Sequence, residues 1–159
     1  MFLRALLAFL ALPGMVAFAV PLLLVQVNGK GMVAHPSALL LLASGVLALL
    51  WCVRDFYVSG RGTLAPWSPP RNLVSVGLYR YSRNPMYLSV LAILLGWALL
   101  FGSLPLLAYA VVVATAFHFR VVLGEEPWLA RMHATQWKSY SRAVPRWVGP
   151  RKWSLSSDA

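Results

Sequence analysis

The sequence predicts an all-α integral membrane protein: a bundle of about four membrane helices, with a helical hairpin in its C-terminal half and a cytoplasmic amphipathic helix at the membrane surface. Of the 159 residues, 60% are hydrophobic and only 11% are charged, whereas an ordinary soluble domain has roughly 25% charged residues. The apolar residues also form runs long enough to cross a bilayer. A water-soluble fold is therefore excluded, and the net charge of +10 indicates a membrane surface rather than nucleic acid.

The first apolar run extends from Ala5 to Val27. As a helix it would be about 34 Å long, which exceeds the roughly 30 Å of a hydrocarbon core. A cleaved signal peptide is the alternative, because Arg4 precedes the run and Ala17-Phe18-Ala19 resembles a processing site.

The second run, from Ser37 to Val53, has 17 residues and lies at the lower limit for a span. Pro36 suits the start of a helix, and we expect the charged pair Arg54-Asp55 to end it. Residues 1–53 would thus hold two membrane helices of a single domain, followed by a cytoplasmic loop at 54–85.

No charged residue lies between Arg83 and Arg120. A single helix over those 36 positions would be about 54 Å long, nearly twice the membrane. The segment must therefore fold back, and Gly102-Ser103-Leu104-Pro105 supplies the break. The sequence predicts a hairpin at 86–119 with arms Met86–Phe101 and Pro105–Phe119.

The distribution of positive charge predicts the topology, because Lys and Arg accumulate on cytoplasmic segments. Thirteen of the fourteen lie before the first run, in the central loop or after the hairpin, and only Lys30 lies on the other side. Both termini and the central loop are therefore expected in the cytoplasm.

The tail at 120–150 does not form another span. On a helical wheel, Trp128, Leu129, Met132 and Tyr140 share one arc, and the basic residues lie opposite them. This pattern predicts one surface helix over 128–140, with its basic stripe toward water or anionic headgroups, although a generic membrane anchor would look the same. Pro127 should move Glu126 out of helical geometry and bend the chain. Residues 151–159 resemble a disordered end.

Two cytoplasmic clusters stand out as candidates for chemistry. The first runs from Arg71 to Tyr87 and is rich in Arg and Tyr. Asn84 could cap the helix that Pro85 opens, and a helix start also suits an anionic ligand group. The alternatives are simple helix punctuation and an interfacial belt of aromatic and basic side chains.

The second cluster is Glu125-Glu126-Pro127-Trp128, which holds two of only four acids. Its carboxylates could bind a cationic group or accept hydrogen bonds from sugar hydroxyls. The alternative is an ion pair with neighbouring arginines. His118 lies seven residues before Glu125, two helical turns away on the same face.

The remaining polar residues do not support other chemistry. Cys52 and the three histidines lack ligand spacing, so no metal is expected. No nucleophile elbow, P-loop or G-x-G-x-x-G motif occurs, so hydrolases and classical dinucleotide folds are disfavoured.

The two clusters together resemble a known family. The run GRGTLAPWSPPRNLVSVGLYRYSRNPMYLSVL, then an apolar hairpin, then AFHFRVVLGEEPWLARMHATQWKSYSRAVPRW resembles the bacterial isoprenylcysteine carboxyl methyltransferase and phospholipid methyltransferase family over about residues 60 to 150. The family pattern is R-H-P-x-Y-x-G, a hairpin, E-E-x-x-L and a Y-x-x-Y-like segment ending near V-P.

The resemblance implies an S-adenosylmethionine-dependent methyltransferase whose cofactor is held between the start of the hairpin and the stretch after it. The acceptor would be a membrane lipid or a lipophilic small molecule carrying a carboxylate, amine or thiol, with neither metal nor nucleic acid as a partner. The implied cofactor contacts are Asn72, Leu73, Val74, Tyr79, Asn84, Pro85, Met86, Tyr87 and Glu125. The residues expected to act in catalysis are Arg83, Arg120 and Glu126, with Glu126 as the candidate base for an amine or thiol acceptor.

The sequence departs from the family pattern at several positions. Asn84 replaces a usual His, Ser89 replaces Gly, and Trp137 replaces a usual Tyr. Prenylcysteine enzymes tend to carry an Arg one turn before the glutamates, where this chain has Val121 with Arg120 beside it, which argues against a prenylcysteine substrate. Two other functions stay open: an NADPH-dependent membrane reductase of the sterol type, and a non-catalytic membrane anchor.

Overall fold

The protein is described from a computed structural model, which covers residues 10–28, 36–60 and 72–150. Those residues form helices and connecting turns without any strand. The expected disordered end at 151–159 and Arg71 of the first cluster lie outside the described residues. Within them, the prediction of an all-α fold is confirmed.

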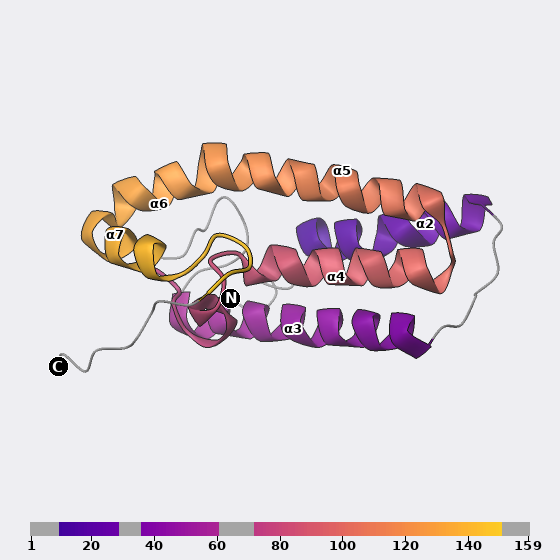
Figure 1. Ribbon diagram of the computed structural model, residues 1–159, viewed down its shortest axis with the longest axis horizontal. Helices are drawn as coiled ribbons and strands as arrows, with labels where there is room; N and C mark the ends of the chain where they lie inside the picture. The colour runs from indigo at the N-terminus through magenta and orange to yellow at the C-terminus, as the bar shows by residue number, and fades with distance from the viewer. Residues whose placement is uncertain (1–9, 29–35, 61–71, 151–159) are drawn as a thin grey trace.

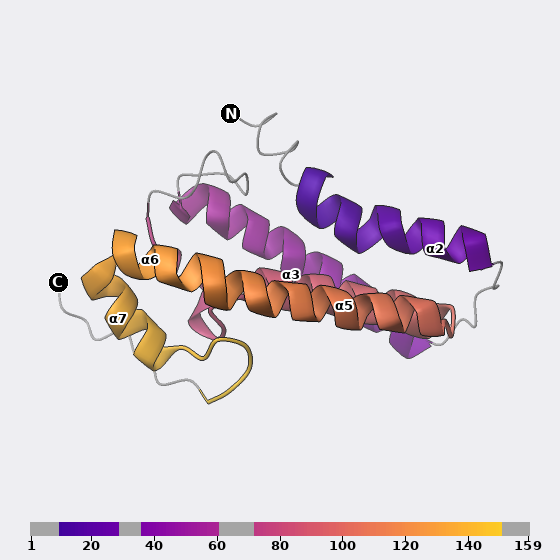
Figure 2. The same cartoon turned by 90° about the horizontal axis from the view of Figure 1, so that it is seen from above.

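Three long helices run side by side through the molecule (Figure 1). They are α3 (Pro36–Gly60), α4 (Pro85–Leu100) and α5 (Leu104–Arg120). The N-terminal pair, η1 (Leu10–Ala19) and α2 (Val20–Asn28), lies along one side of them, as the view from above shows (Figure 2). A short 3₁₀ turn, η2 (Gly77–Arg80), precedes α4, while the π turn η3 (Val121–Glu125) and helices α6 (Glu126–Met132) and α7 (Ala134–Ala143) follow α5.

The bundle has an apolar core to which η1, α3, α4 and α5 all contribute. Its buried members are Ala17, Leu49, Val90, Ile93, Leu94, Ala110 and Val113. Two side chains also fix the irregular π helix η1: the Trp97 indole donates to the Ala17 carbonyl (3.1 Å) and the Tyr109 hydroxyl to the Val16 carbonyl (3.2 Å). These bonds attach η1 to α4 and α5.

Glycine lets α3 and α4 pack closely. A Cβ atom at Gly45 would lie 3.0 Å from the backbone nitrogen of Ile93, and one at Gly96 would lie 3.0 Å from the backbone of Leu42. Small residues at such a crossing allow two membrane helices to approach backbone to backbone. The close contact fixes where α4 begins relative to α3.

The hairpin prediction is confirmed. Helix α4 ends at Leu100, Gly102 turns the chain with φ +52°, and α5 begins at Leu104. A positive φ is readily adopted by glycine because it has no Cβ atom.

Two helices are long and apolar enough to span a membrane, Pro36–Ser59 and Leu104–Met132, and shorter apolar helices cover Pro13–Val27 and Pro85–Leu100. Large apolar side chains are exposed along the outer faces of both long helices, for example Leu40, Leu47, Val111 and Val112. Such continuous apolar surface is unfavourable in water and matches a hydrocarbon environment. The structure therefore supports the membrane class.

Two predicted breaks in helices are wrong. Helix α3 continues past Arg54-Asp55 to Gly60, because the Arg54 side chain is exposed and Asp55 is buried against the η2 turn. Glu126 keeps helical angles, φ −63° and ψ −45°, so the chain does not bend there. The preceding π turn accommodates Pro127, which lacks the N–H that a regular helix would use.

The predicted surface helix over 128–140 is also interrupted. His133, with φ −128° and ψ 39°, separates α6 from α7. The aromatic side chains of α7 do not face lipid, because Trp137 and Tyr140 are buried in a small core with Val144, packed against Leu73 and Leu129. The apolar face that the helical wheel predicted to contact the membrane is therefore partly buried by tertiary packing within the protein.

Candidate active site

Both polar clusters lie at the same end of the bundle, where the start of α4 approaches the chain that follows α5 (Figure 1). The π turn η3 aligns two of the side chains there. In a regular α-helix, two side chains five positions apart point about 140° away from each other. In a π turn, where an N–H bonds to the carbonyl five residues earlier, two such side chains lie closer to the same face. The Glu126 N–H bonds to the Val121 carbonyl in this way, and Arg120 Nε reaches Glu125 Oε1 at 2.9 Å.

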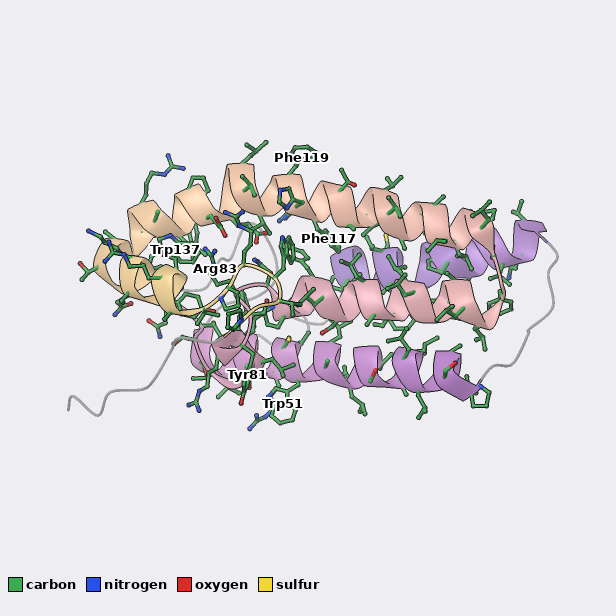
Figure 3. The ribbon with its side chains drawn as sticks, in the orientation of Figure 1. Trp51, Tyr81, Arg83, Phe117, Phe119 and Trp137 are labelled. Atoms are coloured by element: carbon green, nitrogen blue, oxygen red, sulfur yellow. The ribbon has the colours of Figure 1, made fainter. Side chains whose placement is uncertain are left out.

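Tyr87 from α4 completes this group, which we call the Tyr87 triad (Tyr87, Arg120, Glu125). Its hydroxyl donates a short hydrogen bond to Glu125 Oε1 and accepts one from Arg120 Nε at 3.0 Å. The Tyr87 ring packs on Phe117, with centroids 4.3 Å apart, and Figure 3 shows Phe117 between α5 and α4. All the hydrogen bonds of Glu125 within the described residues use Oε1, and its side chain is 35% exposed, so Oε2 can take a ligand.

A second group, the arginine clamp (Arg83, Glu126, Arg146), lies beside the triad. Arg146 donates from Nε and Nη2 to the two oxygens of Glu126 at 2.8 and 2.7 Å, and Arg83 Nη1 lies 2.9 Å from Oε1. The side chains of Arg83 and Glu126 are only 13% and 15% exposed. Both carboxylate oxygens of Glu126 are thus occupied by guanidinium groups, which is the ion-pair alternative of the sequence analysis.

Arg83 also lies over an aromatic ring. Its guanidinium carbon is 5.5 Å from the centre of the Trp137 ring, and the two side chains adjoin beneath α6 in Figure 3. Burial lowers the pKa of Arg83, and the nearby charge of Arg146 acts in the same direction against the opposing effect of Glu126. Its Nε is buried with no hydrogen-bond partner in the described part of the chain, so an anionic group placed there would satisfy an unmet donor.

Asn84 does not cap α4 as expected. Its side chain makes no capping hydrogen bond and instead donates from Nδ2 to the carbonyl of Arg146 at 3.0 Å. The Asn84 side chain binds this carbonyl rather than the helix N–H groups because the loop after α7 lies against the start of α4. Pro85 opens α4 as predicted, and Met86 packs between the main core and the cluster around Cys52.

The remaining predicted residues support the site from behind. Tyr79 is buried against Phe56, and its carbonyl accepts a hydrogen bond from the Tyr140 hydroxyl at 2.7 Å. Burial raises the pKa of Tyr79, with smaller contributions from Cys52, Tyr140 and Glu125. It therefore stays neutral and lies within electrostatic reach of Glu125.

The three predicted cofactor contacts at 72–74 pack against, or bond to, other parts of the fold. Val74 is buried in the cluster with Cys52 and Tyr79, and Leu73 packs on the α7 core. Asn72 is exposed, and its amide donates to the Ser59 carbonyl at the end of α3, at 3.4 Å. The structure brings together Arg83, Tyr87, Arg120 and both glutamates, whereas Asn72 is engaged with α3.

Sequence reasoning missed Arg146 and its loop. Arg146 was counted only as one cytoplasmic charge, although it follows the V-P at which the family pattern ends. His118 accepts a hydrogen bond at Nδ1 from the Trp147 indole at 3.4 Å, and its place on the same face as Glu125 stays a prediction. Within the described residues, no group of three His, Cys, Asp or Glu side chains could hold a metal ion.

The charged residues of the Tyr87 triad and the arginine clamp gather at one end of the hairpin of a helical membrane bundle. Residues 33–136 match the phospholipid methyltransferase family, and this match covers well over half of the chain. The protein belongs to that family and is a membrane methyltransferase. Comparison with curated proteins and with solved structures gave no significant match.

Proposed function

We propose that the protein transfers a methyl group from S-adenosylmethionine to a lipophilic or membrane-accessible acceptor at the cytoplasmic face of the membrane, with both termini in the cytoplasm. The observation that carries this proposal is the meeting of Tyr87, from the start of α4, with Glu125, from the turn after α5. Family membership supports methyl transfer to a lipid acceptor. The cofactor, the acceptor class and the orientation are our inference.

The side chains present fit the cofactor. The Nε of Arg83, which has no partner among the described residues, suits its carboxylate, and the second oxygen of Glu125 suits a ribose hydroxyl or an ammonium group. Tyr87 offers an aromatic ring of the kind that attracts a sulfonium. When bound, the cofactor supplies an activated methyl group, so the protein needs to contribute chiefly orientation and exclusion of water.

Arg120 is suited to an anionic acceptor. Only its Nε is hydrogen-bonded within the described residues, and its side chain is about half exposed. Its other guanidinium nitrogens can therefore bind a carboxylate or phosphate. A carboxylate acceptor needs no base, whereas an amine or thiol does, and the role of Glu126 as that base stays a prediction that its two occupied oxygens make less favourable.

Calorimetric titration of the purified, detergent-solubilised protein tests the cofactor. We expect S-adenosylhomocysteine to bind and NADPH not to bind, and we expect Tyr87→Phe to weaken binding while Tyr57→Phe, on the exposed side of α3, leaves it unchanged. Binding of NADPH alone would establish the reductase. Binding of neither ligand, with Tyr87→Ala and Glu125→Ala harmless in cells, would establish a membrane anchor.

The acceptor can be identified directly. The protein is incubated with methyl-labelled cofactor and total membrane lipid, and the labelled product is analysed by mass spectrometry. We expect label in a lipid with a carboxylate, amine or thiol, and less label with Glu125→Gln at the same concentration of cofactor. Label confined to water-soluble products would contradict a lipophilic acceptor.

A further inference from the structure

The loop after α7, Val144–Trp147, lies beyond the residues that match the family and is tied to the start of α4. The backbone N–H of Arg83 donates to the Pro145 carbonyl at 2.9 Å. The Arg146 carbonyl accepts from Asn84 Nδ2 at 3.0 Å and from Ser82 Oγ at 3.3 Å. Three successive residues of the first polar cluster are therefore held by this loop.

The side chain of Arg146 acts on the same place by another route. It binds both oxygens of Glu126 in a bidentate pair, a geometry that fixes orientation as well as adding energy. Glu126 Oε1 is shared with Arg83 Nη1. The position of the Glu126 carboxylate therefore depends on Arg146, and the position of the Arg83 guanidinium depends on Glu126.

The clamp would be different without Arg146. Glu126 could then turn both oxygens toward Arg83, which would draw its guanidinium out of its present place above Trp137. Hydrogen bonding to Glu126 raises the pKa of Arg146, so the Arg146 guanidinium stays charged. Arg83 thus remains in a position from which Nε is left for a ligand.

We propose that Arg146 is a positioning residue, which holds Arg83 through Glu126 and Asn84 through its own carbonyl in the arrangement that binds the methyl donor. This inference rests on the proposed function, because it assigns Arg83 and Asn84 to the cofactor. Arg146 itself needs no contact with the cofactor or the acceptor.

The test compares Arg146→Met, Arg146→Lys and, as a matched control, Arg142→Met on the exposed side of α7. We expect Arg146→Met to weaken S-adenosylhomocysteine binding about tenfold, in line with the loss of charge-assisted hydrogen bonds, and to raise KM for the donor more than it lowers kcat. Lysine keeps the positive charge but lacks the planar guanidinium that forms the bidentate pair, so Arg146→Lys should retain part of the affinity. Arg142→Met should bind normally.

A double-mutant cycle separates positioning from stability. If Arg146 acts through Glu126, then Arg146→Met should cause little further loss of affinity in a Glu126→Gln background. Full additivity of the two losses would contradict the proposed route. Arg146→Lys keeps the test valid if Arg146→Met does not fold.

Hydrogen exchange of the peptide segment 81–88 gives a reading that needs no ligand. We expect faster exchange in Arg146→Met than in the wild type or Arg142→Met, because the Arg83 and Asn84 contacts loosen. Normal exchange and normal affinity in Arg146→Met would overturn the inference while leaving the proposed function intact. Absence of any S-adenosylhomocysteine binding by the wild type would instead overturn the proposed function, and exchange alone would then decide whether Arg146 holds the segment.

Discussion

Two adjacent glutamates in this protein have opposite surroundings. Glu125 is about one-third exposed and uses one oxygen, toward Tyr87 and Arg120. Glu126 is nearly buried, and both of its oxygens bind arginines from distant segments. Because successive residues on a helix point about 100° apart, one faces the site and the other faces the loop that closes it. In the proposed site, Glu125 would bind the ligand and Glu126 would support the fold.

The largest expected effect is on stability, and it tests the structural role of Glu126. Glu126→Gln leaves two guanidinium groups without a counter-charge, which should lower the free energy of unfolding by about 3 kcal/mol. Thermal or denaturant unfolding in detergent measures the loss. The matched change Glu125→Gln should cost less than about 1 kcal/mol, since its ion pair is more exposed, and equal losses at both positions would show that the two glutamates are equivalent.

Glu125→Gln tests the ligand side. An amide keeps the shape but loses the charge, so S-adenosylhomocysteine affinity should fall by about 10- to 100-fold with the fold retained. Calorimetric titration measures the change, with Tyr57→Phe as the control. Unchanged affinity would remove Glu125 from the site.

The next prediction tests whether the π turn, which aligns Arg120 with Glu125, is needed for the surroundings of Glu125. Pro127→Ala restores an N–H that can bond to the Leu123 carbonyl and lets regular α-helix form through the turn. We expect ligand affinity to fall by up to about fivefold, the equivalent of an exposed ion pair of about 1 kcal/mol. Circular dichroism should show helix content unchanged or higher. A variant with full affinity would indicate that the turn has another origin.

The smallest expected effect concerns the support beneath the site. Burial raises the pKa of Tyr140 above its ordinary value of 10.0. Above about pH 10 the unfolded chain then releases this proton while the folded protein keeps it, so the protein loses stability as pH rises further. Tyr140→Phe should lose about 1 kcal/mol at neutral pH, from the bond to the Tyr79 carbonyl, and should show a shallower loss between pH 10 and 11. An identical alkaline slope in both proteins would contradict this role.

The sequence predicted the fold class and the hairpin because both depend on local features. Long apolar runs and the Gly102 to Pro105 break determine them without reference to the rest of the chain. The ends of helices were harder to predict. Arg54-Asp55 and Pro127 are ordinary stop signals, but a buried partner turn and a π turn respectively allow the helix to continue through them.

The meeting of residues in the candidate site was predictable in part for the same reason. Tyr87 and Glu125 belong to motifs that the family resemblance identifies, and the structure brings them together. Arg146 belongs to no motif on its own, and its role depends on contacts with residues about sixty positions earlier. Asn84 was mispredicted for the same reason. Its local sequence favours a helix cap, but its side chain donates to the carbonyl of Arg146, which is distant in the sequence.

The contacts of the 144–147 loop also set an order for biosynthesis. The hairpin can insert into the bilayer as soon as α5 has left the ribosome, but the start of α4 must wait for Pro145 and Arg146, which are translated last among the contacting residues. Assembly of the end that holds the candidate site is therefore a late event that follows insertion. A nascent chain arrested before residue 145 should be membrane-integrated yet incompetent for ligand.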